Sequence, residues 1–260
     1  MTNSVGSSLG ITIKSEREVN LMRQSGVVTN NVKKLLREKI KTGMTTSDID
    51  TIAENQIRSE GAIPAFKGLY GFPATVCASI NEEIVHGIPG NRVLLDGDIL
   101  SIDVGAIVEG YYSDSAFTIG IGSIKQKSAD LIKATYDSLR VGIKKVKPGA
   151  RIGDISSAIQ QFAENSGYSV VREYVGHGIG RELHEDPQIP NYGFAGEGPL
   201  LHAGMTIAIE PMLNIGGWKT MQKEDGWTVV TSDGSLSAHF EDTILVTDCG
   251  FEVLTNEEIN

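Results

Sequence analysis

Two aspartates lie within the stretch SIDVGAIVEGYYSDSAF, residues 101–117, in segments that are otherwise apolar and strand-like. A hairpin that turns near residues 108–110 would bring Asp103 and Asp114 almost opposite each other, with Cβ atoms on the order of 5 Å apart if they share a face. Two carboxylates this close repel each other, and the pKa of one rises strongly unless a cation lies between them. The pair is therefore either two satisfied structural acids or part of a metal site.

Two further acids lie in apolar runs. Glu210 belongs to GMTIAIEPML and Glu241 to LSAHFEDTILVT. Either one alone fits a structural or edge-strand role. Together the four carboxylates carry four negative charges, which two divalent cations would balance. Two ions bridged by carboxylates can activate a water molecule and stabilise the oxyanion of a hydrolysed bond.

Three of the five histidines lie in glycine-flanked motifs. His177 and His184 belong to YVGHGIGRELHEDP, and His86 belongs to VHGIP. A lone histidine is usually a hydrogen-bonded structural residue, but glycines beside an imidazole allow backbone to approach whatever the ring touches. This concentration favours chemistry. Oxygen-rich ligation with one imidazole suits manganese, iron(II), cobalt or magnesium.

The elements that must position these residues predict an α+β fold. Ser15 and Glu18 form a capping-box pattern that opens a helix ending near residue 40. Further helices are predicted over residues 45–60, 125–146 and 152–165, with strands between them and after them. Helix pairs that alternate with groups of strands are typical of the α+β class.

The chain also contains an internal repeat. Residues 39–61 match residues 145–167 without gaps at an offset of 106 (145 − 39), and GDILSID matches GMTIAIE at an offset of 107 (204 − 97). The second match places Asp103 and Glu210 at equivalent points. We therefore expect one catalytic domain, residues 13–260, built from two related halves, and a disordered Gly/Ser-rich tail over residues 1–12.

Composition narrows the class of function. The formal charge of −10 argues against binding to nucleic-acid backbones, DNA included, or to anionic membranes. Two cysteines are too few for a disulfide framework. The N-terminus lacks the pattern of a secretory signal, and no apolar run has the length of a membrane span. A cytoplasmic protein is expected, and since no coiled coil is predicted, a monomer.

Taken in order, five blocks resemble those of a type I methionine aminopeptidase. They are FPATVCASINEEIVHGIP, SIDVGAIVEGYYSD, GHGIGRELHEDP, GMTIAIEPM and GWTVVTSDGSLSAHFEDTILVT, and the resemblance runs from about residue 15 to residue 255. It implies the duplicated pita-bread fold, an antiparallel sheet with flanking helices. There is no Cys-rich N-terminal extension, and only 31 residues (241 − 210) separate Glu210 from Glu241, so the short bacterial-like form fits best.

The resemblance also implies roles for individual residues. The implied metal ligands are Asp103, Asp114, His177, Glu210 and Glu241, which would hold two divalent ions (cobalt, manganese, iron(II) or zinc). Glu210 would also be the base that activates water, and His86 and His184 would contact the substrate and the tetrahedral intermediate. The pocket for the methionine side chain would include Phe66, Leu69, Phe72, Cys77, Leu183 and Trp227, each of which also fits ordinary core packing.

Four positions depart from the pattern of the family. Phe66 and Leu69 stand where a cysteine and a tyrosine are frequent, and Leu183 stands where an aromatic residue is frequent, which leaves the shape of the pocket open. His239 replaces a more usual glutamine. It lies two residues before Glu241 and so points to the same face of a strand. Both a structural role and an approach to the metals are open for His239.

The implied reaction is hydrolysis of the first peptide bond of a nascent polypeptide, which releases methionine when the second residue is small. Contact with the ribosome is left open. The nearest alternative is a pita-bread Xaa-Pro peptidase, which shares the metal ligands. A non-catalytic pita-bread binding protein is the alternative from another class, and five intact ligand positions count against it.

Overall fold

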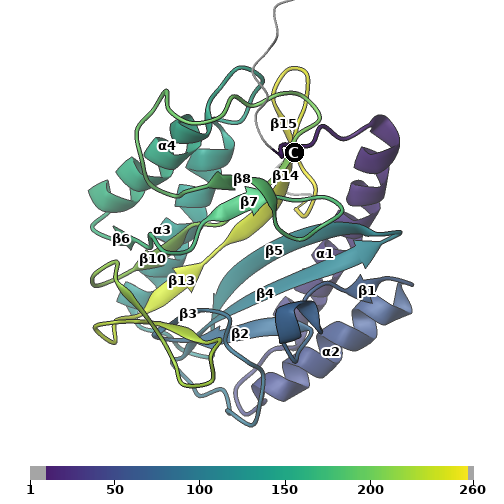
Figure 1. Ribbon diagram of the computed structural model, residues 1–260. Helices are drawn as coiled ribbons and strands as arrows, with labels where there is room; N and C mark the ends of the chain where they lie inside the picture. The colour runs from purple at the N-terminus through teal and green to yellow at the C-terminus, as the bar shows by residue number, and fades with distance from the viewer. Residues whose placement is uncertain (1–9, 257–260) are drawn as a thin grey trace, which may run out of the picture.

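The computed structural model describes residues 10–256, in which four helices flank a central sheet (Figure 1). The helices are α1 (Glu16–Lys39), α2 (Thr46–Ser59), α3 (Gln126–Ile143) and α4 (Ile152–Asn165), with a short 3₁₀ helix, η1 (Leu69–Gly71). The predicted capping box at the start of α1 is confirmed, because the Glu18 carboxylate accepts from Ser15 N at 2.9 Å. None of the helices in residues 10–256 is long and apolar enough to cross a membrane.

The main sheet has nine strands in the order β1-β4-β5-β14-β9-β7-β8, with β2 also paired to β4 and β15 to β14. Every pairing within it is antiparallel. Two three-stranded sheets, β13-β10-β6 and β11-β12-β3, complete the fold. The strands are β1 (Ile63–Pro64), β2 (Val76–Ile80), β3 (Glu83–Val85), β4 (Ile99–Val108), β5 (Tyr111–Gly120), β6 (Ser169–Val170), β7 (Gly176–Gly178), β8 (Glu185–Ile189), β9 (Thr206–Ile209), β10 (Met212–Asn214), β11 (Thr220–Gln222), β12 (Val229–Thr231), β13 (Ser237–His239), β14 (Glu241–Val246) and β15 (Phe251–Val253). This arrangement is the predicted α+β class.

The two faces of the central sheet have different tasks. Ile102 of β4 belongs to the apolar core that also contains Leu36 of α1 and Ile155 of α4. Because side chains alternate along a strand, Asp103 points to the opposite face. The helices therefore seal one face with the core and leave the other face for the acids.

The hairpin that carries the two aspartates has a slightly different register from the one expected. Its turn consists of Glu109 (φ 47°) and Gly110 (φ 81°), between the paired residues Val108 and Tyr111. With a two-residue turn, Asp103 pairs with Ala116 and Asp114 pairs with Gly105. The aspartates are therefore diagonal neighbours on one face and not almost opposite each other as expected. The register differs by two residues from the one that would pair Asp103 with Asp114.

Equivalent elements recur at the offset found in the sequence. Helix α4 begins 106 residues after α2 (152 − 46 = 106) and has the same length of 14 residues. The glycines on either side of α2 and α4 take matching positive φ values: 89° at Gly43 and 83° at Gly149 before them, 75° at Gly61 and 86° at Gly167 after them. Only glycine adopts this backbone conformation without strain. The two halves thus repeat each other in structure as well as in sequence.

The start of the chain meets the loop that contains the predicted site residue His184. Of the tail predicted over residues 1–12, residues 1–9 lie outside the described residues. Thr12 Oγ1 donates to Glu185 Oε2 at 2.7 Å, and Lys14 Nζ donates to the same oxygen at 2.6 Å. Residues 10–12 are described, and the contact at Thr12 joins the segment before α1 to the first residue of β8, which follows His184 directly.

Candidate metal centre and substrate pocket

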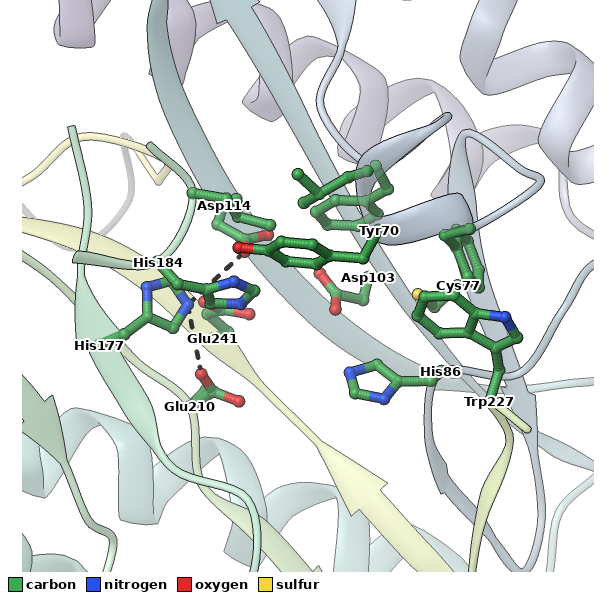
Figure 2. Close-up of a pocket in the computed structure, with 14 residues that line it drawn as sticks. Tyr70, Cys77, His86, Asp103, Asp114, His177, His184, Glu210, Trp227 and Glu241 are labelled. Atoms are coloured by element: carbon green, nitrogen blue, oxygen red, sulfur yellow. Dashed lines mark ion pairs between the residues drawn. The ribbon is translucent and has the colours of Figure 1, made fainter. Parts of the chain in front are cut away.

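Three adjacent strands place carboxylates on the face of the sheet opposite the helices. Ala116 in β5 pairs with Asp103 in β4 on one side and with Glu241 in β14 on the other, so these three residues form a row across the sheet. Asp114 lies two residues before Ala116 on the same face. The small side chain of Ala116 leaves room between the acids, which converge on a common space (Figure 2).

The second half of the chain supplies a histidine and the fourth acid. His177 in β7 pairs with Ala208 in β9, and Glu210 follows directly after β9. His177 Nε2 lies 3.6 Å from Glu210 Oε1 and 3.9 Å from Asp114 Oδ2 (Figure 2). His177 Nδ1 is 2.9 Å from the carbonyl of Gly178, which can only accept. The ring proton is therefore on Nδ1, and the Nε2 lone pair faces the acids.

The electrostatics of this cluster call for a cation. Burial raises the pKa of Asp103 to about 7. Burial first, and then repulsion from neighbouring carboxylates, hold the pKa values of Asp114, Glu210 and Glu241 well above their ordinary range. Burial lowers the pKa of His177 to about 4, so its imidazole is neutral at pH 7. Four crowded acids and a neutral imidazole are costly to bury without a positive charge between them.

Buried carboxylate oxygens without hydrogen-bond partners show that a divalent metal fits this cluster. Across residues 10–256, Oδ1 of Asp103, Oδ1 of Asp114 and Oε1 of Glu241 are buried without any hydrogen-bond partner. Ligand atoms of Asp114, His177 and Glu241 lie within 4.8 Å of one another. A second set of this kind is formed by Glu210, His239 and Glu241. Glu241 belongs to both sets.

An apolar pocket opens beside the acids. Its cavity of about 170 Å³ is lined by the four carboxylates, by His86, His177 and His184, and by all six residues predicted for the methionine pocket: Phe66, Leu69, Phe72, Cys77, Leu183 and Trp227. The rings of Phe72 and Trp227 meet edge to face with centroids 5.1 Å apart. The structure therefore brings every predicted site residue to one cavity.

Tyr70 also lines the cavity, although it was not among the residues predicted for it. Its ring lies parallel to that of His184, with centroids 6.1 Å apart, and it is 75% exposed at the rim of the pocket (Figure 2). Its backbone φ of 50° is unusual for a residue other than glycine. The glycines at 68 and 71 were the available signal, since they mark a tight turn that presents an aromatic side chain.

His86 and His184 line the cavity beside the acid cluster. The ring of His184 lies edge-on to His177 at 4.5 Å between centroids. His86 has a φ of 60°, a strained conformation of the kind that clusters at functional sites. Burial, followed by repulsion from His184, lowers the pKa of His86 to about 4, and burial also lowers the pKa of His184. Both rings are neutral at pH 7 and can donate one hydrogen bond each.

Glu185 fixes the loop that carries His184. Its Oε1 accepts from the backbone N–H of Arg181 at 2.7 Å, while Lys14 pairs with its Oε2 at 2.6 Å. The Glu185 carboxylate thus connects the two ends of the loop at Arg181 and Glu185, and it connects this loop to Lys14 in the segment before α1. His184 is thereby held over His177 by contacts outside the cavity.

Behind the acids, α1 supplies a buried cation to the helix-facing side of the sheet. Lys33 is 2% exposed, and its Nζ lies 2.5 Å from Ser115 Oγ and 3.1 Å from Asp242 Oδ1. Ser115 Oγ also lies 2.6 Å from the carbonyl oxygen of Glu241. Lys33 is therefore linked by one hydroxyl to the backbone of the strand that carries Glu241.

Comparison with known proteins agrees with this geometry. Residues 20–248 match metallopeptidase family M24. The chain is 51% identical over 245 residues to methionine aminopeptidase 1 of Bacillus subtilis (strain 168). The alignment covers 94% of this chain and 99% of that protein.

Solved structures show the same fold. The structure of a methionine aminopeptidase from Thermotoga maritima superposes with a TM-score of 0.94 at 47% identity and covers 95% of this chain and all of that one. A prolidase from Pyrococcus horikoshii OT3 shares the fold alone, with a TM-score of 0.76 at 24% identity over 94% of this chain and 63% of that one. The fold is therefore the pita-bread arrangement that both kinds of enzyme share, and the chain belongs to metallopeptidase family M24.

Proposed function

We propose that this protein is a methionine aminopeptidase, which hydrolyses the first peptide bond of a polypeptide and releases its N-terminal methionine. The observation that carries the proposal is the junction of two features in one cavity. An acid and imidazole cluster suited to divalent metal forms one wall, and an apolar pocket lined by Phe72, Cys77 and Trp227 forms another. A cavity of about 150 Å³ can hold a benzene-sized apolar group, so the pocket has room for one side chain.

The proposed ligands are Asp103, Asp114, His177, Glu210 and Glu241. Two divalent ions would balance the four carboxylates. Cobalt, manganese, iron(II) and zinc are the proposed ions, since the set combines carboxylate oxygens with an imidazole nitrogen. When bound, such ions lower the pKa of water and stabilise developing negative charge on oxygen. Neutral His177 offers the Nε2 lone pair to this centre, because its Nδ1 proton is engaged with Gly178.

The protein's own residues would then handle protons and orientation. Glu210, one of the four acids of the cluster, would accept a proton from the attacking water and pass it to the nitrogen of the peptide bond that breaks, which leaves as an amine. His86 and His184 are neutral and donate to the substrate carbonyl and to the oxyanion that forms from it. The apolar pocket receives the methionine side chain and excludes water around the bond.

The first test is hydrolysis of Met-Ala-Ser by metal-stripped protein titrated with manganese or cobalt, with bound metal measured in parallel. Methionine release that appears with metal and disappears with chelator is the expected result. Ala-Pro peptides test the Xaa-Pro alternative in the same assay, and release from them alone would overturn the assignment. Tight metal binding without release from either peptide would favour a non-catalytic binding protein.

The setting of the reaction follows from the substrate. We infer that the enzyme acts in the cytoplasm as a monomer on nascent polypeptides, with residues 13–260 as a single catalytic domain. The net charge of −10 supports a substrate other than nucleic acid. Co-sedimentation with translating and empty ribosomes would show whether the enzyme also contacts the ribosome.

A further inference from the structure

His239 is a buried histidine whose free nitrogen faces the proposed metal centre. It ends β13, two residues before Glu241, and is 1% exposed. Its Nε2 lies 4.0 Å from Glu210 Oε2 and 3.9 Å from Glu241 Oε2. Within residues 10–256, this nitrogen has no hydrogen-bond partner.

Hydrogen bonds fix the backbone at His239. Thr118 Oγ1 accepts from His239 N at 2.9 Å and donates to His239 O at 2.8 Å. Thr118 in turn shares a hydrogen bond of 2.8 Å with Ser101. These bonds fix the backbone at His239, and because the residue is 1% exposed, close packing leaves its ring little space to turn away from Glu210.

A purely structural histidine would use Nε2 in a hydrogen bond, since an unsatisfied buried polar atom costs about 1–3 kcal/mol. Two donor atoms that each lie about 2.0–2.2 Å from one ion can be as much as about 4.4 Å apart. The separations of 3.9 Å and 4.0 Å fall inside this limit. Ligation of an ion shared with the two glutamates therefore explains why Nε2 is aimed at them and is otherwise unused.

We propose that His239 is an additional metal ligand, which binds through Nε2 on the side of the centre formed by Glu210 and Glu241. The proposal rests on the metal-dependent function proposed above and adds a second imidazole to it. His177 would then serve the set that contains Asp114, and His239 the set that contains Glu210. Where the family more often has glutamine, this chain offers a nitrogen ligand.

A second imidazole changes which metals the centre prefers. Imidazole suits cobalt, iron(II) and zinc better than it suits manganese or magnesium, which favour oxygen. Substitution of His239→Gln should weaken cobalt binding by about tenfold or more, because even residues that only orient a ligand contribute 10–100-fold. The affinity for manganese should fall by a smaller factor.

The test uses the full chain, stripped with chelator and loaded with two equivalents of cobalt(II). X-ray absorption counts the imidazoles bound, and calorimetry gives the affinities for cobalt and manganese. The expected count is two imidazoles per two cobalt ions in the unchanged protein and one in H239Q. The matched control is H202Q, which makes the same change at an exposed histidine and should alter neither the count nor the affinities.

Each outcome decides a different point. A count of one imidazole in the unchanged protein, or an H239Q protein with the same count and affinities, would overturn the role of His239 and leave the proposed function standing. Failure of the unchanged protein to bind cobalt would overturn both. If H239Q does not fold, the count in the unchanged protein still decides.

Discussion

Asp114 is one of the acids that the surrounding structure disfavours in their charged form. It is 4% exposed, faces Asp103 and Glu210, and has an Oδ1 atom without a partner among residues 10–256. A hydrogen bond from the Ser115 backbone stabilises the carboxylate, but burial and repulsion from Asp103 outweigh it and hold the pKa of Asp114 well above its ordinary range. Asp114 is therefore suited to binding a metal, and without metal its ionised carboxylate lowers the free energy of unfolding.

Substitution of Asp114→Asn should abolish catalysis without unfolding the protein. We expect kcat/KM for Met-Ala-Ser to fall by at least about a hundredfold, which is the loss that even an indirect partner of a metal can cause. The chelated variant should be as stable as the chelated parent or more so, because the amide removes a buried repulsion. Peptide kinetics at limiting metal and urea unfolding measure the two effects. Unchanged turnover at limiting metal would remove Asp114 from the ligand set.

At the residue level, the sequence predicted which residues line the site better than it predicted how they are placed relative to one another. The four acids stood out because each interrupts an apolar run, and His86, His177 and His184 because glycines flank them. The diagonal placement of Asp103 and Asp114 could not be read from the same letters, since it depends on the two-residue turn at Glu109. Nor could the direction of His239 Nε2, since it is brought close to Glu210 and Glu241 only in the folded protein.

At the scale of elements, the alternation of β14 couples the metal face to α1. Glu241 points to the cavity, and the next residue, Asp242, points to the helix and meets Lys33 at 3.1 Å. Burial lowers the pKa of Lys33, while attraction to Asp242 opposes that shift. The pair is buried on both sides, so removing one partner leaves the other charge without its counter-ion in a dry interface.

Substitution of Lys33→Met should therefore destabilise the chelated protein by about 3–5 kcal/mol, the usual cost of breaking a buried ion pair from one side. The double variant K33M/D242L should recover much of this loss, because both buried charges are gone. Urea unfolding of the three proteins measures the difference. K127M is the control at an exposed lysine and should stay within about 0.5 kcal/mol of the parent. A double variant no more stable than K33M alone would contradict this account.

The start of α1 gives a pH-dependent contribution to stability. The Ser15 backbone N–H, followed by the Tyr111 hydroxyl, lowers the pKa of Glu18 to about 2 from an ordinary value of 4.5. Between these two values the unfolded chain binds more protons than the folded one, so folding gains stability as pH rises. The contribution is complete above about pH 4.5 and is lost as pH falls towards 2.

E18Q keeps an oxygen acceptor but removes the charge. Its deficit in stability relative to the parent should be largest near neutral pH and should shrink as pH falls from about 4.5 to 3. Urea unfolding of both proteins in chelator, at several pH values, tests this while excluding metal effects. A deficit that stays constant over this range would mean that the charge of Glu18 contributes nothing.

The sequence predicted the helices closely and the smaller sheets hardly at all. Capping pairs such as Ser15 with Glu18 are local signals, and α4 begins and ends where its periodicity predicted. Strand β13 is three residues long and pairs with β10, which lies far from it in sequence. Short strands of this kind depend on partners brought by the rest of the fold, so no local pattern identifies them.

At the scale of the whole molecule, the centre lies where the two related halves meet. Asp103 and Asp114 come from the half that contains α2, whereas His177, Glu210 and Glu241 follow α4. Strands β5 and β14 pair across this junction. The repeat in the sequence already placed Asp103 and Glu210 at equivalent points, but only the paired strands explain how the acids of both halves face one space.

Metal bound at this junction should act as a cross-link between the halves. Free metal at about 100 times its Kd should stabilise the protein by about 2.7 kcal/mol. For a chain of this size, that corresponds to a rise in Tm of roughly 5–10 °C. Thermal unfolding with and without manganese or cobalt measures the shift, and D114N should show a much smaller one.

Hydrogen exchange then distinguishes a cross-link from a local effect. Because β5 and β9 carry or adjoin acids from opposite halves, metal should slow exchange in both strands together. Protection confined to one half would contradict a ligand set that spans the junction. Protection of both halves in the parent, and of neither in D114N, would tie the stability of the whole domain to the same buried carboxylates that are proposed to bind the ions.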